Sequence, residues 1–489
     1  MLKAILSIGA IQAIAIIIQF LRSKVVAVTL GPAGVGVVST IDQTVQFVAF
    51  AAAFSIPLAS VKFLSKAHSE GHEAFKRCYA GFFQLLGLLA AVGTGLVAGL
   101  IFLRPGIFGA EIEKYHVYLL VALLSLPTLI LGGFFSNVFA AAQNYRASAA
   151  LAIITSAVTT IAVIAGIFAD GIFGLFIGGS LASIAVTLGI TVYLWTKLEL
   201  PFFADGTKNL KELWQSPNII SFTAMLYFGS VSYSLSLLVA RYAILANFGE
   251  TETGLLQGAL VLSVAIGMVL NPANGLYLTP IMNRNIEKVE KIRRAAEFQR
   301  KMAIILCLVS LPAVMFPQLL LAIMFSTKFA PVGNLVFLFI FAQFVTQMAG
   351  VHQAVLIGFD DLKIYTVIVT GGQIGYAVLA WFLAPHYGIK GIALGSVISS
   401  LAIFSLTFIR LKIKHGFSAP RNLSLLIGYG LFILLMTGWI CSQINEWDIT
   451  VSVLKVGFFA LFAASLLLFL SKEERFALYE LRNKISFGR

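Results

Sequence analysis

Long apolar segments recur along almost the whole chain, and they limit its fold more than any other feature. Of the 489 residues, 59% are hydrophobic and only 11% are charged, with a mean hydropathy of +0.94. A helix needs about 20 such residues to cross the roughly 30 Å hydrocarbon core of a bilayer. The sequence therefore predicts an all-α polytopic membrane protein with fourteen transmembrane helices, at roughly 4–30, 36–62, 78–103, 116–141, 146–168, 171–195, 218–247, 253–281, 302–326, 332–357, 363–385, 389–410, 423–443 and 449–470.

The basic residues lie in alternate loops, and this predicts the orientation of the chain. If Met1 is cytoplasmic, 26 of the 34 Lys and Arg residues fall on the cytoplasmic side, whereas the outer loops hold four, at 104, 114, 328 and 390. Membrane proteins show this excess in their cytoplasmic loops. We therefore expect both termini in the cytoplasm. The net charge of +13 has this origin and does not indicate a nucleic-acid partner.

The sequence carries no recognisable catalytic or metal-binding motif. GxxxxGK[ST], GxSxG, HExxH and CxxC are all absent. Cys78, Cys307 and Cys441 lie far apart and are predicted to be free thiols. The outer loops are short, which argues against an external polymerase domain. We therefore predict that the protein is not an enzyme and has no catalytic residue, no metal and no cofactor.

The chain resembles itself at a spacing of about 217 residues. Leu30-Gly31 followed by Gly36 returns as Phe248-Gly249 followed by Gly254, and Asp170–Gly174 returns as Tyr387–Gly391. The glycines fit tight turns between helices. Six spans fill the interval, so both halves would cross the membrane in the same direction, as in two-lobed transporters. The predicted organisation is an N-terminal lobe of six helices (1–196), a cytoplasmic amphipathic linker (197–217), a C-terminal lobe of six helices (218–411), two extra helices (412–470) and a cytoplasmic tail (471–489).

Four charged residues interrupt the apolar helices near the predicted outer turns. Arg22 and Lys24 precede the first turn, Asp42 follows it, and Arg241 lies eight residues before Gly249. At 1.5 Å per residue, all four would lie about 9–12 Å from an outer turn and so in one layer. Charged residues at such depth usually face a bundle interior or a watery cavity. The layer has a net positive charge, which suits an anionic ligand, and the forked donors of Arg favour phosphate.

Helix geometry separates the two cations of the first span. Two residues correspond to about 200° around a helix, so Arg22 and Lys24 cannot both face the cavity. Arg22 follows the face of Gln12 and Gln19, which favours it for the cavity. Lys24 would then pair with Asp42 or contact a neighbouring helix. Structural ion pairing is the alternative reading for both arginines.

Amide side chains in the spans are candidates for binding sugar hydroxyls. They are Gln19, Gln43, Gln46, Asn137, Asn271, Asn274, Gln343, Gln347 and Gln353. Hydrogen bonding between helices is the alternative role for each of them. His352 and Asp42 are candidates for coupling transport to a proton or sodium gradient. For His352 the alternative is a hydrogen-bonded interior histidine.

Together these features resemble the polysaccharide flippases (the O-antigen flippase, or polysaccharide transporter, family) of the multidrug/oligosaccharidyl-lipid/polysaccharide exporter superfamily. The residues that carry the resemblance are the Arg-bearing first span running into LGPAGVG, the six-plus-six repeat and the cationic interior. The resemblance implies a bacterial inner-membrane protein that moves an undecaprenyl-diphosphate-linked oligosaccharide from the inner to the outer leaflet by alternating access. It also implies membrane lipids and polysaccharide polymerase machinery as partners.

The resemblance also implies roles for individual residues. In the related lipid II flippases, arginines of the first and later spans bind the diphosphate beside an acidic residue of the second span. Arg22 or Lys24, Arg241 and Asp42 look like the comparable positions, and Leu423–Leu470 would form the groove for the lipid tail. The second span here has no arginine, which favours a glycan other than lipid II. The alternatives are a lipid II flippase, a multidrug or cation antiporter of the same superfamily, and a membrane-bound polysaccharide polymerase.

Overall fold

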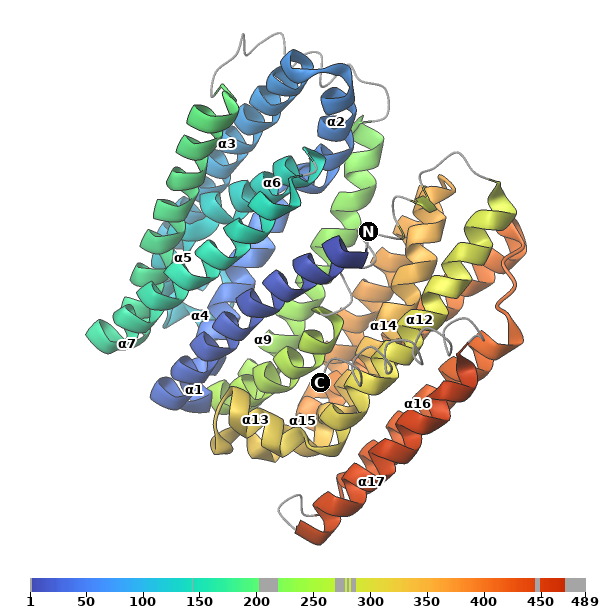
Figure 1. Cartoon of the computed structure of the whole chain (residues 1–489). Coiled ribbons are helices and arrows are strands. Elements are labelled where there is room, and N and C mark those ends of the chain that lie inside the picture. Colours follow the sequence, from blue (N-terminus) through green and yellow to red (C-terminus); the bar gives the residue numbers. More distant parts are fainter. Residues whose placement is uncertain are drawn as a thin grey trace, which may run out of the picture. The chain divides into compact units, whose positions relative to one another are not determined.

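A computed structural model describes residues 2–142, 144–201, 219–268, 278, 281–282, 287–444 and 449–470. Throughout these ranges the regular structure is helical, which confirms the all-α prediction for them. Figure 1 shows the helices in chain order by colour. The longer ones are α1 (Leu2–Ala53), α2 (Ile56–Glu70), α3 (His72–Leu103), α6 (Leu126–Ala141), α7 (Tyr145–Leu198), α9 (Ile219–Met268), α12 (Lys288–Met315), α14 (Gly333–Gly358), α15 (Leu362–His415), α16 (Arg421–Cys441) and α17 (Ile449–Leu466). Shorter helices include α4 (Ala110–Glu113), α5 (His116–Ala122) and α13 (Pro317–Met324).

Ten helices within the described ranges are long and apolar enough to cross a membrane, so the chain is a multi-pass membrane protein. Some of them are too long for one crossing. The 54 residues of α7 would extend about 80 Å, against a hydrocarbon core of about 30 Å. Breaks in α1, α7, α9 and α15 fall where the sequence predicts turns between spans. The total of fourteen spans stays a prediction.

Each of these breaks is at a glycine with a positive φ. The φ angles are 68° at Gly31, 52° at Gly171, 81° at Gly249 and 55° at Gly388. Only glycine adopts this left-handed region without a steric cost, which explains why the helices reverse there. The predicted glycine turns are therefore confirmed. Gly31 and Gly249, and likewise Gly171 and Gly388, are related by the repeat that the sequence shows.

The helices divide into two compact units. The first comprises Met1–Gly258, Ala322–Phe329 and Asp360–Ile403, and the second comprises Ala259–Leu321, Ala330–Phe359 and Phe404–Arg489. The candidate charged residues Arg22, Lys24, Asp42 and Arg241 all belong to the first unit, whereas His352 belongs to the second. The lobes predicted from the repeat have other boundaries and stay a prediction. Most of the predicted linker and the whole tail lie outside the described residues.

Large side chains fill the interior of each unit. In the first unit, Tyr79 stacks on Phe134 with ring centroids 5.6 Å apart, and Phe82 packs against the same ring. In the second unit, Phe344 and Phe417 are fully buried. The three cysteines are free, as predicted, and Cys307 and Cys441 are buried.

Candidate anion-binding site

Arg22 and Asp42 lie on opposite arms of the hairpin that Gly31 makes in α1. Asp42 interacts electrostatically with Arg22 and with Arg241 of α9. Within the described ranges, no ion pair of 4.0 Å or less joins Asp42 to either arginine. Arg22 is half-buried and Asp42 is exposed. The structure thus brings three of the four predicted charges into one electrostatic group without a direct contact between them.

Arg241 is held on the corresponding hairpin of α9. Its side chain is only 6% exposed. Nη2 donates to Oε1 of Gln257 at 2.6 Å, and Nη1 donates to the carbonyl oxygen of Leu237 at 3.2 Å. The Nε–H of Arg241 is buried and has no hydrogen-bond partner in the described part of the chain. A buried donor without a partner costs about 1–3 kcal/mol, so this nitrogen marks a place for an acceptor.

The sequence analysis missed Gln257, although the sequence holds a signal for it. Arg241 lies eight residues before Gly249 and Gln257 lies eight after it, so a hairpin at Gly249 places the two side chains opposite each other. Tyr376 was also missed. Its phenol lies within electrostatic range of Arg241, as does that of Tyr233. Tyr376 comes from α15, and nothing local in the sequence indicates that contact.

Lys24 points away from this group. Its Nζ donates to the carbonyl oxygen of Ala322 at 2.5 Å, in the last turn of α13. The C-terminal carbonyls of a helix attract cations, so this contact is favourable. Of the two alternatives for Lys24, the structure therefore has the contact with a neighbouring helix and not the pair with Asp42.

Three of the candidate amides of the first unit form hydrogen bonds between helices. Gln43 donates to Ser234, at 3.1 Å to Oγ and 3.3 Å to the carbonyl oxygen. Asn137 donates to the carbonyl oxygen of Pro57 at 2.6 Å, and Gln19 donates to Oγ of Ser156 at 3.3 Å. These contacts match the structural alternative for the three residues. Gln46 is exposed and stays a candidate for the ligand.

His352 of the second unit is enclosed by polar and aromatic side chains. His352 is 1% exposed, and the amide nitrogen of Gln299 donates to its Nε2 at 3.0 Å. An amide nitrogen can only donate, so the ring proton of this histidine is on Nδ1, which faces Oγ1 of Thr407 at 3.3 Å. His352 is therefore a hydrogen-bonded interior histidine in this structure.

The remaining amide candidates belong to the second unit. A Cβ added to Gly267 would meet the amide nitrogens of Gln343 and Gln347, so these two side chains lie against that glycine. Gln353 is half-buried. Asn271 and Asn274 lie outside the described residues, and their predicted roles stay predictions.

The two hairpins of the charged group touch through a reciprocal pair of glycines. A Cβ added to Gly36 would lie 2.0 Å from the carbonyl oxygen of Glu250, and a Cβ added to Gly254 would lie 1.8 Å from that of Pro32. Each glycine thus meets the residue four positions before the other, as a pseudo-two-fold relation requires. The contact joins the two repeats directly, and any side chain at either glycine would separate them.

Glu250 adds a polar contact beside the glycines. One of its carboxylate oxygens accepts hydrogen bonds from Nζ of Lys114, at 2.7 Å, and from the hydroxyl of Tyr115. Lys114 also lies over the ring of Tyr115, 4.9 Å from its centroid. The donors Lys114 and Tyr115 lower the pKa of Glu250 below its ordinary value. We call this group of three residues the outer clasp, since all three lie at predicted outer turns.

The lowered pKa of Glu250 predicts how the outer clasp depends on pH. A carboxylate whose pKa falls on folding stabilises the fold above its ordinary pKa of 4.5, and this contribution is lost as the pH falls through the lowered value. The pair is partly exposed, so we expect about 1 kcal/mol or less. In a thermal unfolding series from pH 7 to pH 3, wild type should lose more stability than Glu250→Gln. Parallel curves for the two proteins would contradict the clasp.

The fold and the charged group define a class of protein: a multi-pass membrane protein with helical hairpins and a buried arginine in a group of charged residues. Comparison with known proteins narrows this class. The family model for polysaccharide biosynthesis proteins matches residues 1–286, which is more than half of the 489 residues. The chain therefore belongs to the polysaccharide biosynthesis protein family.

Named relatives and solved structures agree with this membership. The lipid III flippase of Escherichia coli (strain K12) is 20% identical over 389 residues, which cover 79% of this chain and 92% of the relative. The structure of the lipid II flippase MurJ in an inward closed conformation matches with a TM-score of 0.68 at 14% identity. The match covers 94% of this chain and 98% of the MurJ chain. An inward-facing multidrug resistance MATE transporter of the MOP superfamily matches with a TM-score of 0.64 at 14% identity. This match covers 80% of this chain and 94% of the transporter chain.

These comparisons confirm the resemblance that the sequence indicated. The two solved structures are matches of fold, since their identity to this chain is low. The named relatives are flippases and transporters and not catalysts, which agrees with the prediction that this protein is not an enzyme.

Proposed function

We propose that this protein is a flippase that exports an undecaprenyl-diphosphate-linked oligosaccharide from the inner to the outer leaflet of the bacterial cytoplasmic membrane. The observation that carries the proposal is the buried guanidinium of Arg241, whose Nε–H has no partner and which shares its electrostatic group with Arg22 and Asp42. Family membership and the lipid III flippase relative support it.

The physical task explains why such a group is useful. A diphosphate with attached sugars must cross about 30 Å of hydrocarbon while its prenyl chain stays in the lipid. Burying an unpaired phosphate charge costs many kcal/mol, and paired guanidinium donors offset much of this cost. Arg22 and Arg241 supply two cations and Asp42 supplies one anion, so the group keeps one net positive charge that attracts a diphosphate.

The polar groups around Arg241 are suited to this ligand. Gln257 holds one edge of the guanidinium, and the free Nε–H leaves another donor for a phosphate oxygen. Tyr233 lies within electrostatic range of Arg241, so its phenol is a candidate to contact the sugar next to the diphosphate. Gln46, exposed one helical turn after Asp42, is our candidate for the same role.

Alternating access would let one site serve both leaflets. The pair Gly36 and Gly254 and the outer clasp would hold the two repeats together on the outer side while the substrate enters from the inner leaflet. Asp42 is our candidate for coupling to a proton or sodium gradient, because it is an exposed carboxylate that interacts electrostatically with two cations. His352, enclosed by Phe404, Phe408 and Phe417, is the weaker candidate.

A lipid II flippase is the second candidate function, since the MurJ fold matches 94% of this chain. A cation antiporter is less well supported, because the charged group has more cations than anions. The test is depletion of the protein in its host, followed by mass spectrometry of the lipid-linked sugars. We expect one diphosphate-linked oligosaccharide to accumulate on the inner leaflet and its polymer to disappear. Accumulation of lipid II would support the second candidate, and unchanged lipids with sensitivity to cationic dyes would contradict both.

A further inference from the structure

The two arms of α7 are tightly joined at one end. A Cβ added to Gly166 would lie 2.0 Å from the carbonyl oxygen of Gly174, and a Cβ added to Gly178 would lie 2.3 Å from that of Ala162. The backbones therefore touch for about two turns on either side of the break at Gly171. Such contacts between small residues are the usual way in which membrane helices approach closely.

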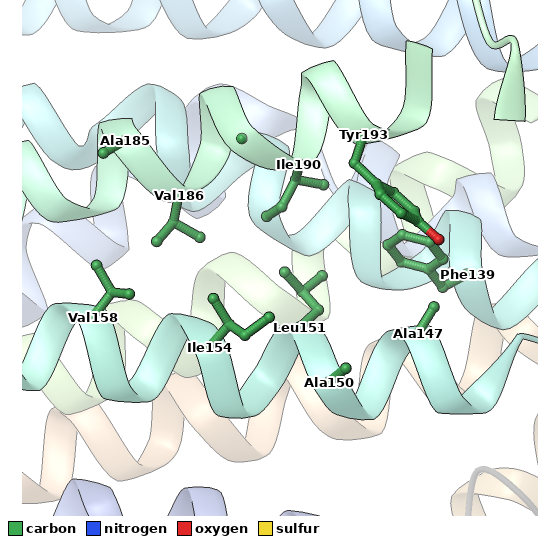
Figure 2. Close-up of a pocket in the computed structure, with 11 residues that line it drawn as sticks. Phe139, Ala147, Ala150, Leu151, Ile154, Val158, Ala185, Val186, Ile190 and Tyr193 are labelled. Carbon is green, nitrogen blue, oxygen red and sulfur yellow. The ribbon is translucent and has the colours of Figure 1, made fainter. Parts of the chain in front are cut away.

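Toward their other ends the arms separate and enclose a pocket of about 520 Å³. Its lining is almost entirely apolar, and Figure 2 shows the side chains of the two arms facing each other across it, with Phe139 of α6 beside Tyr193. The volume lies in the range of about 300–1,000 Å³ that ligand pockets occupy. Ile154 is 54% exposed and Tyr193 is 44% exposed, so the pocket opens to the surroundings of the protein.

The second repeat provides an internal comparison, because α15 makes the same hairpin and its two arms touch at the corresponding level. At the level of the pocket, Oγ of Ser399 donates to the carbonyl oxygen of Gly372 at 2.5 Å, and Gly372 lies against Ile403. The sequence shows the difference between the hairpins. With the offset of 217, Val186, Gly189 and Ala150 of the pocket correspond to Ile403, Leu406 and Val367. At these three positions the first repeat has the smaller side chain, whereas at Ile154, Val158 and Ile190 the second repeat has the smaller residue, namely Gly371, Gly375 and Thr407.

A cation lies in line with the pocket. Val186, Ile190, Tyr193 and Lys197 follow one another at helical spacing on the same face of α7. Lys197 is exposed in the last turn of the helix, on the predicted cytoplasmic side. An apolar pocket that leads through a tyrosine to a lysine matches a lipid whose chain is apolar and whose head carries phosphate.

The position of Ser156 bears on which kind of lipid the pocket takes. Ser156 lies between the pocket residues Ile154 and Val158 along the chain, yet it is buried and bonded to Gln19 of α1. The arm of α7 thus separates the pocket from α1, which carries Arg22. A substrate with its diphosphate at Arg22 would have to carry its chain around this arm to reach the pocket. A lipid of the surrounding bilayer reaches it directly, because Ile154 and Tyr193 at the pocket are exposed.

We propose that this pocket binds one acyl chain of an anionic phospholipid of the cytoplasmic leaflet, with the headgroup phosphate at Lys197. An apolar cavity stays dry and takes apolar ligands, so hydrocarbon fills it in a membrane. The bound chain would act as a wedge that keeps the arms of α7 apart. The proposal does not depend on the identity of the transported substrate.

Native mass spectrometry of the full-length protein, released from vesicles of equal parts phosphatidylglycerol and phosphatidylethanolamine, tests this site. Wild type should retain one phosphatidylglycerol. Gly189→Leu introduces the residue found at the corresponding position of the second repeat. This variant should lose the phosphatidylglycerol because the leucine fills the pocket. Val192→Leu adds volume on the exposed surface of α7 outside the pocket lining and should retain the lipid. Lys197→Gln should reduce the preference for the anionic lipid about fivefold.

Several results would overturn the proposal. Equal retention by wild type and Gly189→Leu would mean that the lipid does not bind in the pocket. An unchanged headgroup preference in Lys197→Gln would mean that Lys197 does not bind the headgroup phosphate. Displacement of the retained lipid by added undecaprenyl diphosphate would assign the pocket to the substrate chain. Failure of the proposed flippase function would leave all these measurements unaffected, so the two proposals fail separately.

Discussion

Arg241→Ala is expected to reduce export of the lipid-linked glycan at least about tenfold, because it removes a charge-assisted hydrogen bond to phosphate worth about 1.5–3 kcal/mol. The guanidinium is buried, held by Gln257 and left with a free Nε–H. No other Lys or Arg lies in Ile219–Met268, so no neighbouring cation on α9 replaces it. The measurement is complementation of a depleted strain, with surface polymer quantified against the amount of protein in the membrane.

Two further variants separate binding from folding. Arg241→Lys keeps the positive charge but loses the planar pair of guanidinium donors that can bind a phosphate in two places. Its export should lie between that of wild type and that of Arg241→Ala. Gln257→Glu keeps an acceptor at the same place and adds a carboxylate beside the guanidinium. It should fold well, since it gains an ion pair, yet export poorly, since the cation is neutralised. If Arg241→Ala exported as well as wild type at normal protein levels, Arg241 would not be part of the substrate-binding site.

The second large effect is expected at the glycine pair. Gly36→Ala should lower the thermal stability by about 1–3 kcal/mol, the usual cost of forcing an extra group into a packed site. The new Cβ would lie 2.0 Å from the backbone oxygen of Glu250, which cannot rotate away as a side chain can. Export should fall together with the stability, because the new methyl group would hold the two repeats apart where they meet.

Gly99→Ala is the matched control for this prediction. Gly99 is exposed on α3, and a Cβ added there meets nothing within 4 Å. Alanine is the better helix former by about 1 kcal/mol, so this variant should be neutral or slightly stabilised. Unfolding of detergent-purified protein, followed by fluorescence, compares the two. If Gly36→Ala were as stable as Gly99→Ala, the close contact of the repeats would be refuted.

The elements that the sequence predicts well are those with a local cause. Gly31, Gly171, Gly249 and Gly388 are turns because only glycine tolerates the required φ, and the repeat places them in corresponding pairs. Arg22, Asp42 and Arg241 come together because each is a fixed number of residues from such a turn. The apolar segments predict helices because length and hydropathy alone decide what can cross a bilayer.

Contacts between distant helices were beyond a reading of the sequence. Lys24 could have turned to Asp42, and only the position of α13 shows that it binds the oxygen of Ala322. Lys455 of α17 attracted no attention in the sequence, yet it is buried and donates to the carbonyl oxygen of Met315 at 2.7 Å. His352 has polar and aromatic neighbours from two other helices, α12 and α15, which no spacing rule indicates.

The most direct test of the central proposal is the binding preference of the purified protein in nanodiscs. Affinity for an undecaprenyl-diphosphate sugar and for a cationic dye would be measured with wild type and Arg241→Ala. If arginines from both repeats bind the diphosphate, wild type should bind the anionic lipid more tightly than the dye, and Arg241→Ala should lose this preference. Tighter binding of the dye by wild type, unchanged in the variant, would contradict the account.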